Sequence, residues 1–139
     1  MADTANVQIV KDAYASFERG DIPALLNMLT DDVTWYLPGP PDIPSAGQRT
    51  GRDEVADFFV KLNESDEVLA FEPHAYFSDG DTVVVLGRYS ARVRKTARIT
   101  DFEWVHVFTI RDGRVAGWEE FYDTAAVVEA YRTEAAVPL

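Results

Sequence analysis

The chain has 139 residues, the size of one domain, and we expect a single domain over residues 1–139. It has 24 acidic and 13 basic residues, and this net charge of -11 disfavours nucleic acids and anionic membrane surfaces as partners. The absence of cysteine excludes disulfides and thiolate chemistry. With no signal-peptide pattern and no run near the ~18 apolar residues of a membrane helix, we expect a cytoplasmic location.

The first third of the chain predicts two helices and a short strand. Apolar residues at spacings of three and four predict a helix over residues 4–19, and Gly20 is typical of its C-terminal end. Asp21 is expected to cap a second short helix with Pro23 in its first turn, and Asp31-Asp32 to end it. Alternation from Val33 to Leu37 then predicts a strand.

Residues 38–50 contain four of the seven prolines and predict a loop, either a lid over a site or a surface excursion. Thr50 is expected to cap a third helix, with Asp53 in a capping-box-like position. The buried stripe expected for this helix consists of Val55, Phe58, Phe59 and Leu62.

The rest of the chain predicts mainly strands, at residues 71–77, 82–93, 102–110 and 114–122, followed by a short helix capped by Thr124. Residues 94–98 are expected to be a connection. Helices followed by an antiparallel meander indicate the α+β class. We therefore predict a cone-shaped, strongly curved antiparallel sheet with three N-terminal helices enclosing a pocket.

The hairpin over residues 102–123 decides which side chains face that pocket. A three-residue loop at residues 111–113 pairs Ile110 with Arg114 and places His106 opposite Trp118. A two-residue loop at Asp112-Gly113 would bring the opposite face of the second strand inward. We prefer the first register. The inward face is then expected to carry Phe102, Trp104, His106, Phe108, Trp118, Glu120 and Tyr122.

Two segments carry a family resemblance: RGDIPALLNMLTDDVTW at residues 19–35 and WVHVFTIRDGRVAGWEEFYD at residues 104–123. With the order of elements, they resemble the nuclear transport factor 2-like superfamily, in its SnoaL-like and ketosteroid-isomerase-like branch. The resemblance implies a curved sheet, an apolar pocket and a homodimer. SnoaL-like polyketide cyclases pair a pocket histidine with an aspartate one strand over, and His106 and Glu120 match that arrangement.

Two other activities of the superfamily fit fewer residues. Epoxide-hydrolase-like enzymes share the acidic residue at Glu120, but this chain has Arg88-Tyr89-Ser90 where they have an Arg-x-Asp pair. The catalytic tyrosine and base of ketosteroid isomerases fall near Ala13 and Leu37, so steroid isomerisation by that mechanism is not expected.

The predicted function is acid–base chemistry on a small, apolar, carbonyl-containing molecule, as isomerase, cyclase or lyase, with no cofactor and no metal. His106 and Glu120 are the predicted catalytic pair, because an imidazole and a carboxylate among aromatic rings can divide acid and base roles. The expected substrate-binding residues are Tyr14, Trp35, Phe58, Phe59, Trp104, Trp118 and Tyr122. The alternatives are a non-catalytic domain that binds a small apolar ligand and an epoxide-hydrolase-like enzyme.

The outer face of the sheet is expected to form the homodimer, because Val105 and Val107 would otherwise be exposed in mid-sheet. The arginines of the middle strands, Arg88 among them, allow two interpretations. One of them could reach the pocket, or all could form ion pairs with Glu103 and its neighbours on the outer face.

Overall fold

The computed structural model describes residues 2–134, so the predicted domain over residues 1–139 includes residue 1 and residues 135–139 that lie outside the described residues. The helices are α1 (Ala2–Glu18), α2 (Ile22–Asn27), α3 (Arg52–Ser65) and α4 (Thr124–Arg132). The strands are β1 (Leu29–Leu37), β2 (Gly47–Thr50), β3 (Asp66–Asp79), β4 (Thr82–Val93), β5 (Ile99–Arg111) and β6 (Arg114–Phe121). Among residues 2–134, no helix is long and apolar enough to cross a membrane.

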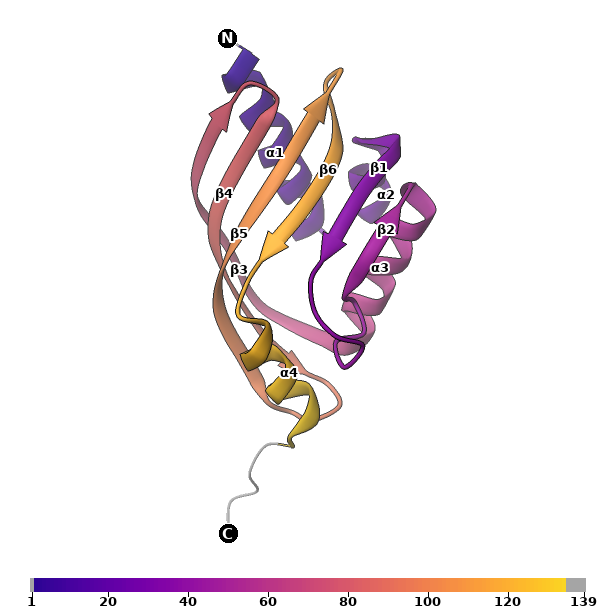
Figure 1. Ribbon diagram of the computed structural model, residues 1–139, viewed down its shortest axis with the longest axis vertical. Coiled ribbons are helices and arrows are strands. Elements are labelled where there is room, and N and C mark those ends of the chain that lie inside the picture. The colour runs from indigo at the N-terminus through magenta and orange to yellow at the C-terminus, as the bar shows by residue number, and fades with distance from the viewer. Residues whose placement is uncertain (1, 135–139) are drawn as a thin grey trace.

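The six strands form one open, strongly curved sheet in the order β2-β1-β6-β5-β4-β3 (Figure 1). This arrangement confirms the predicted α+β cone. One pairing differs from the predicted antiparallel sheet, because β1 runs parallel to β6. The long strands β3, β4 and β5 bend together along their length, and the bend leaves a hollow on one side of the sheet.

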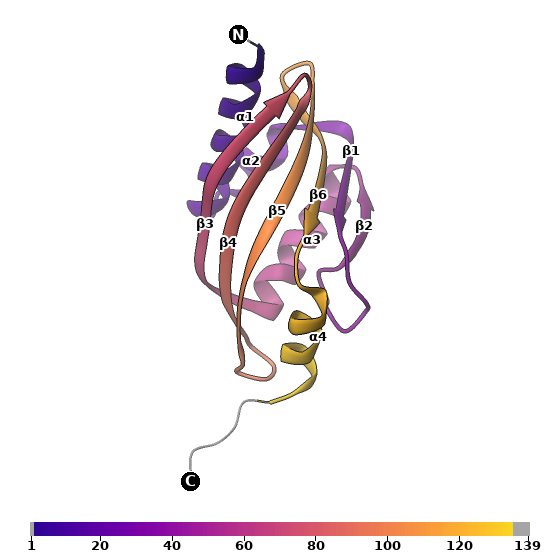
Figure 2. The same ribbon diagram turned by 60° about the vertical axis from the view of Figure 1, so that its left-hand side comes forward.

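Helices α1, α2 and α3 cover that hollow side, while α4 lies across one end of the sheet (Figure 2). Each covering helix turns an apolar stripe toward the strands, as its periodicity predicts. Helix α1 buries Val10 and Tyr14, and α3 buries Val55, Phe58 and Phe59. The main core therefore lies between these helices and the concave face of the sheet.

Gly87 on β4 makes room for a tryptophan on the neighbouring strand. It pairs with Trp104 of β5, and a Cβ at Gly87 would lie 2.2 Å from the indole ring. A glycine inside a strand often marks such a close approach. The indole can therefore lie flat against the sheet, where it borders the hollow.

The turn between β5 and β6 is tighter than predicted. Asp112 and Gly113 form a two-residue turn with φ angles of 52° and 76°, so Arg111 pairs with Arg114. The preferred three-residue loop is therefore wrong. Asparagine, aspartate and glycine tolerate these positive φ angles, which explains why this sequence can form the shorter turn.

A β-bulge nevertheless keeps the predicted face of β6 pointing inward. The register shifts between the pairs Ile110–Val115 and Thr109–Gly117, which leaves Ala116 as an extra residue. This residue restores the alternation that the short turn would have reversed. As a result, His106 lies opposite Glu120 instead of Trp118.

Residues 38–50 are not entirely a loop. Residues 47–50 form β2, an edge strand that pairs with β1, and only residues 38–46 lack a strand or helix. Strand β1 also begins at Leu29, so Asp31 and Asp32 lie in a strand instead of ending a helix there. The sequence of β2, Gly-Gln-Arg-Thr, has no apolar alternation that could have predicted the strand.

Two of the three predicted helix caps differ in position. Asp21 caps α2 as predicted, since its side chain accepts a hydrogen bond from the Ala24 N–H. The cap of α3 is Gly51 instead of Thr50, and the cap of α4 is Asp123 instead of Thr124. Asp123 performs the same function, because its carboxylate accepts a hydrogen bond from the Ala126 N–H.

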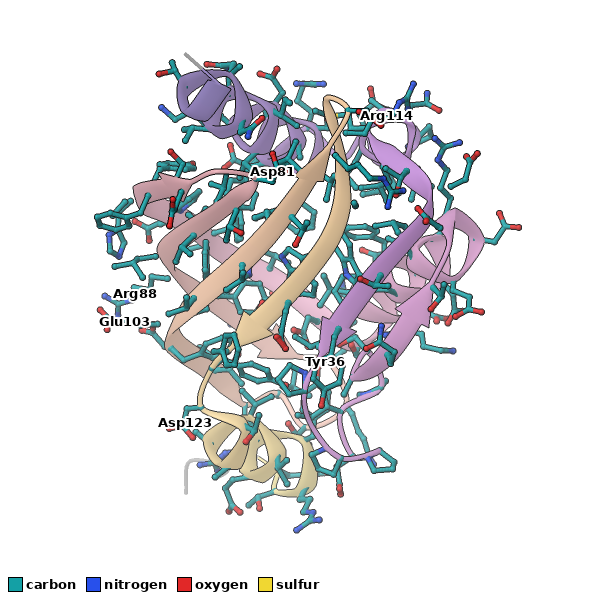
Figure 3. The ribbon with its side chains drawn as sticks, turned by 45° about the horizontal axis from the view of Figure 1, so that its top comes forward. Tyr36, Asp81, Arg88, Glu103, Arg114 and Asp123 are labelled. Carbon is teal, nitrogen blue, oxygen red and sulfur yellow. The ribbon has the colours of Figure 1, made fainter. Side chains whose placement is uncertain are left out.

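The arginines of the middle strands lie outside the hollow. Arg88 forms a two-point ion pair with Asp101, with nitrogen–oxygen distances of 2.8 and 2.7 Å. Figure 3 shows Arg88 and Glu103 close together at the edge of the molecule, directed away from the sheet. Arg92 pairs with Glu67 at 3.7 Å. The outer-face interpretation is therefore confirmed for Arg88 and Arg92, with Asp101 as the partner of Arg88 and Glu67 as the partner of Arg92.

The contact between Gly87 and Trp104 predicts the effect of one added methyl group. We expect Gly87→Ala to lower the free energy of unfolding by about 1–3 kcal/mol, because the new Cβ overlaps the indole and must displace it. Chemical denaturation measures this change. Ser90→Ala, on the other face of the same strand, is the control, and equal stability of the two variants would contradict the predicted overlap.

Candidate functional site

A cavity of about 100 Å³ lies between the concave face of the sheet and the helices. Its wall is almost entirely apolar and aromatic. An engineered apolar cavity of ~150 Å³ binds benzene, so this space suits a guest with about one ring. A polycyclic guest would require the wall to move.

All nine residues predicted for the site border this cavity. The structure brings together His106, Glu120, Tyr14, Trp35, Phe58, Phe59, Trp104, Trp118 and Tyr122. They come from α1, α3, β1, β5, β6 and the segment that follows β6. Their placement agrees with the predicted alternation of the strands, while their roles in catalysis and binding stay predictions.

The polar centre of the cavity is a chain of three hydrogen-bonded side chains. The Nε2 atom of His106 lies 2.7 Å from Oε1 of Glu120 on the neighbouring strand. Its Nδ1 atom lies 2.8 Å from the hydroxyl oxygen of Tyr14 on α1. The imidazole is therefore held from both sides, by the sheet and by the helix that covers it.

Burial shifts the pKa values of His106 and Tyr14, two of the three hydrogen-bonded side chains. It lowers the pKa of His106, and the hydrogen bond and charge of Glu120 oppose that effect. Burial also raises the pKa of Tyr14, with smaller contributions from Tyr76 and Glu120. At neutral pH the Nε2–H of a neutral His106 therefore donates to Glu120, and the Tyr14 hydroxyl donates to Nδ1.

Aromatic rings enclose the imidazole. The Trp104 ring stacks on it with a centroid distance of 3.8 Å and an interplanar angle of 14°. Trp118 approaches edge-on at 4.9 Å. The carboxylate is more accessible, since the side chain of Glu120 is 13% exposed against 5% for His106. Glu120 is thus the member of the pair that a guest can reach more easily.

Two indole N–H groups in the cavity wall have no hydrogen-bond partner among residues 2–134. They belong to Trp35 and Trp104. The Trp35 ring also stacks on the Trp118 ring, with a centroid distance of 4.5 Å. A buried donor without a partner costs free energy.

The sequence interpretation missed a second polar group at this cavity. Asp66, Tyr89 and Tyr131 all border it, and both tyrosine hydroxyls donate to the Asp66 carboxylate. For Tyr89 a signal was available, because the alternation Val83-Val85-Gly87-Tyr89 directs it inward. Asp66 and Tyr131 had no such signal, since their meeting depends on how α4 returns across the end of the sheet.

Residues 38–46 and α4 cover one end of the cavity. Ile43 and Ser45 are buried and border it, which supports the lid interpretation of this loop over that of a surface excursion. The Tyr122 hydroxyl donates to the Pro38 carbonyl. An exposed two-point ion pair joins Asp42 of the loop to Arg132 of α4.

The curved sheet, the covering helices and the histidine–carboxylate pair define an α+β cone with an apolar cavity. The chain belongs to the SnoaL-like domain family, which it matches over residues 10–118. It is similar to a nuclear transport factor 2-like protein from Burkholderia xenovorans, with 34% identity, 95% and 99% coverage of the two chains and a TM-score of 0.86.

Other relatives share the fold and have no assigned function. A nuclear transport factor 2-like protein of unknown function from Burkholderia pseudomallei is 28% identical, with coverage of 93% and 98% and a TM-score of 0.83. An uncharacterized protein from Mycobacterium tuberculosis is 25% identical over 134 residues, with coverage of 94% and 98%. These similarities agree with the assignment of the chain to the SnoaL-like domain family.

The lowered pKa of His106 predicts how stability depends on pH. Below the ordinary value of 6.5, the unfolded chain binds a proton at this residue before the folded chain does. The stability that His106 contributes is therefore complete above pH 6.5 and decreases as the pH falls toward the lowered pKa. The decrease can reach about 1.4 kcal/mol per pH unit.

Denaturation of the wild type and His106→Asn between pH 8 and 5 isolates this effect. We expect the stability of the wild type relative to the variant to decrease as the pH falls below about 6.5. His74→Asn, at an exposed histidine, is the matched control and should give a profile parallel to the wild type. A constant difference between wild type and His106→Asn over this pH range would show that the pKa of His106 is not lowered.

Proposed function

We propose that this protein is an enzyme that transfers a proton on a small, apolar, carbonyl-containing molecule held in the aromatic cavity. The observation that carries the proposal is the 2.7 Å hydrogen bond between His106 and Glu120 at the cavity wall. Burying a carboxylate and an imidazole in apolar surroundings costs stability, and such pairs are typical of sites that perform acid–base chemistry. The SnoaL-like family supports this class of function.

Glu120 is the proposed base. Its Oε1 is held by the Nε2–H of His106, while its greater exposure leaves the carboxylate available to a guest. It would take a proton from the carbon next to the carbonyl group and return it at another atom. Isomerisation, aldol-type cyclisation and dehydration all begin with this step.

His106 is proposed to hold the carboxylate of Glu120 in position and to stabilise its negative charge through the hydrogen bond from Nε2–H. Both ring nitrogens of the neutral imidazole are already bonded, one to Glu120 and one to Tyr14. When Glu120 is protonated, the hydrogen bond from Nε2 still fixes the orientation of the carboxyl group.

A non-catalytic domain that binds a small apolar ligand is the second candidate. The observation that favours it is that both ring nitrogens of His106 are already hydrogen-bonded. An imidazole in this state has no free position for proton transfer. The two candidates differ in one measurable property. Only the enzyme accelerates the exchange of a proton on a bound carbonyl compound.

The neighbouring acids of β6 provide a matched test of catalysis. Acetophenone in D2O serves as a one-ring carbonyl probe, and NMR measures deuterium incorporation into its methyl group. We expect the wild type to catalyse this exchange and Glu120→Gln to reduce the rate by about 10²-fold or more. Glu119→Gln alters the adjacent residue, which points to the other face of the sheet, and should exchange at the wild-type rate.

Melting temperatures show that both variants remain folded. Equal exchange rates for Glu120→Gln and the wild type would contradict the role of Glu120 as the base. No exchange by the wild type, together with measurable binding of acetophenone, would favour the ligand-binding domain.

We also propose that two copies associate through the outer face of the sheet. Paired residues form an apolar strip across it: Phe77, Val84 and Val107 in one row, and Leu86, Val105 and Phe121 in the next. Phe77 and Phe121 are 58% and 52% exposed. In a protein with a charge of -11, such an apolar strip fits the same strip of a second copy around a two-fold axis.

A charge placed inside the strip tests this association. We expect Val105→Glu to convert a dimer into a monomer, because a carboxylate in the centre of the strip would be buried without a partner. Light scattering with size-exclusion chromatography measures the mass. Val60→Glu, at an exposed apolar residue of α3, should leave the mass unchanged, and a monomeric wild type would contradict the proposal.

A further inference from the structure

The second polar group of the cavity is a buried carboxylate with two tyrosine donors. Asp66, the first residue of β3, is 7% exposed. The Tyr89 hydroxyl lies 2.7 Å from its Oδ2 atom, and the Tyr131 hydroxyl donates to Oδ1. These residues come from β3, β4 and α4, so the fold brings three separate segments to one point of the cavity wall.

A row of aromatic rings leads from Tyr89 of this group to Tyr122, two residues after Glu120 in the chain. The ring centroids of Tyr89 and Phe102 lie 5.4 Å apart, and those of Phe102 and Tyr122 lie 5.2 Å apart. Burial raises the pKa of both Tyr89 and Tyr122, and the negative charges of Asp66 and Glu120 contribute for each. Both polar groups border the same cavity, so one elongated guest can approach them together.

The hydrogen-bond capacity of the group determines what it can recognise. Each tyrosine donates its single hydroxyl proton to Asp66, so neither has a proton left for a guest. Each carboxylate oxygen can accept about two hydrogen bonds, and one tyrosine occupies each. The positions that remain free on Asp66 can only accept hydrogen bonds. A guest must therefore supply a hydrogen-bond donor.

A neutral hydroxyl group fits better than an ammonium group. Burial in the aromatic and apolar wall raises the pKa of Asp66, and the hydrogen bonds from Tyr131 and Tyr89 oppose that effect by stabilising the charged form. Removing an ammonium ion from water would carry a desolvation cost that this partly satisfied carboxylate offsets incompletely. A hydroxyl loses much less hydration and uses the free acceptor positions directly.

We propose that Asp66, with Tyr89 and Tyr131, forms a second subsite that binds a hydroxyl group of the guest. The substrate is then a cyclic or aromatic carbonyl compound with a hydroxyl group at the end away from the reacting carbon. The presence of a carbonyl group in the substrate rests on the proposed function. The presence of a hydroxyl group rests on Asp66, Tyr89 and Tyr131 alone.

The other role open to Asp66 is to fix α4 to the sheet through Tyr131. That role predicts a change in stability when Asp66 is altered, with no preference among guests. The subsite predicts a preference for a hydroxyl-bearing guest that disappears with the carboxylate. The ratio of two dissociation constants separates these roles, because a general loss of stability does not favour one guest over another.

Acetophenone and 4-hydroxyacetophenone form a suitable pair of probes, because they share one ring and one carbonyl group and differ by a single hydroxyl. NMR titration measures both dissociation constants. We expect the wild type to bind 4-hydroxyacetophenone about tenfold more tightly, the effect of one hydrogen bond to a charged acceptor. In Asp66→Asn the preference should fall to about twofold or less, since the amide group is uncharged and a weaker acceptor.

Two further variants complete the test. Tyr131→Phe keeps the carboxylate and frees one acceptor position, so its preference should equal or exceed that of the wild type, even if Asp66→Asn fails to fold. Glu120→Gln should keep the preference while it loses deuterium exchange. If exchange is absent from the wild type and the preference remains, the proposed function fails and the hydroxyl subsite stands.

Several results would overturn the subsite. One is a wild type that binds the two probes equally or binds neither. Another is an unchanged preference in folded Asp66→Asn, or its loss in folded Tyr131→Phe. Loss of the preference in Glu120→Gln would place the hydroxyl at the other acid. Tighter binding of 4-(aminomethyl)acetophenone than of 4-hydroxyacetophenone would show that the group recognises a cation.

Discussion

The hydrogen bond between His106 and Glu120 depends on the register of one hairpin. The two residues face each other across β5 and β6 because the bulge at Ala116 restores the alternation that the two-residue turn reverses. Tyr14 then bonds the other imidazole nitrogen, so helix α1 and the sheet meet at the same ring. The packing of α1 over the hollow and the chemistry of the cavity therefore require the same pairing of strands.

The cavity combines the buried acid Asp66 and the half-buried acid Glu120 with an otherwise apolar wall. Each acid has hydrogen-bond donors from different segments: Glu120 from His106, and Asp66 from Tyr89 and Tyr131. These bonds offset part of the cost of removing the carboxylates from water. They also fix the positions of both acids in the wall, which is a condition for recognising two groups of one guest.

The sequence predicted the fold and the nine residues of the cavity because they follow from local alternation and helix periodicity. The inward face of β5, for example, is visible as Trp104, His106 and Phe108. The turn of the hairpin was mispredicted, because a bulge inside a strand leaves the alternation of the remaining residues unchanged. Asp66 was missed for a different reason: its partners Tyr89 and Tyr131 are brought to it by tertiary contacts that no local pattern records.

The attachment of α4 has a consequence for how quickly a guest can leave. A helix of nine residues is too short to be stable alone, so α4 depends on contacts such as Tyr131 with Asp66 and the exposed ion pair of Arg132 with Asp42. Detachment of α4 would open this end of the cavity at a lower cost than unfolding of the sheet. We therefore expect residence times to reflect the motion of this helix, and to shorten in high salt as the ion pair is screened.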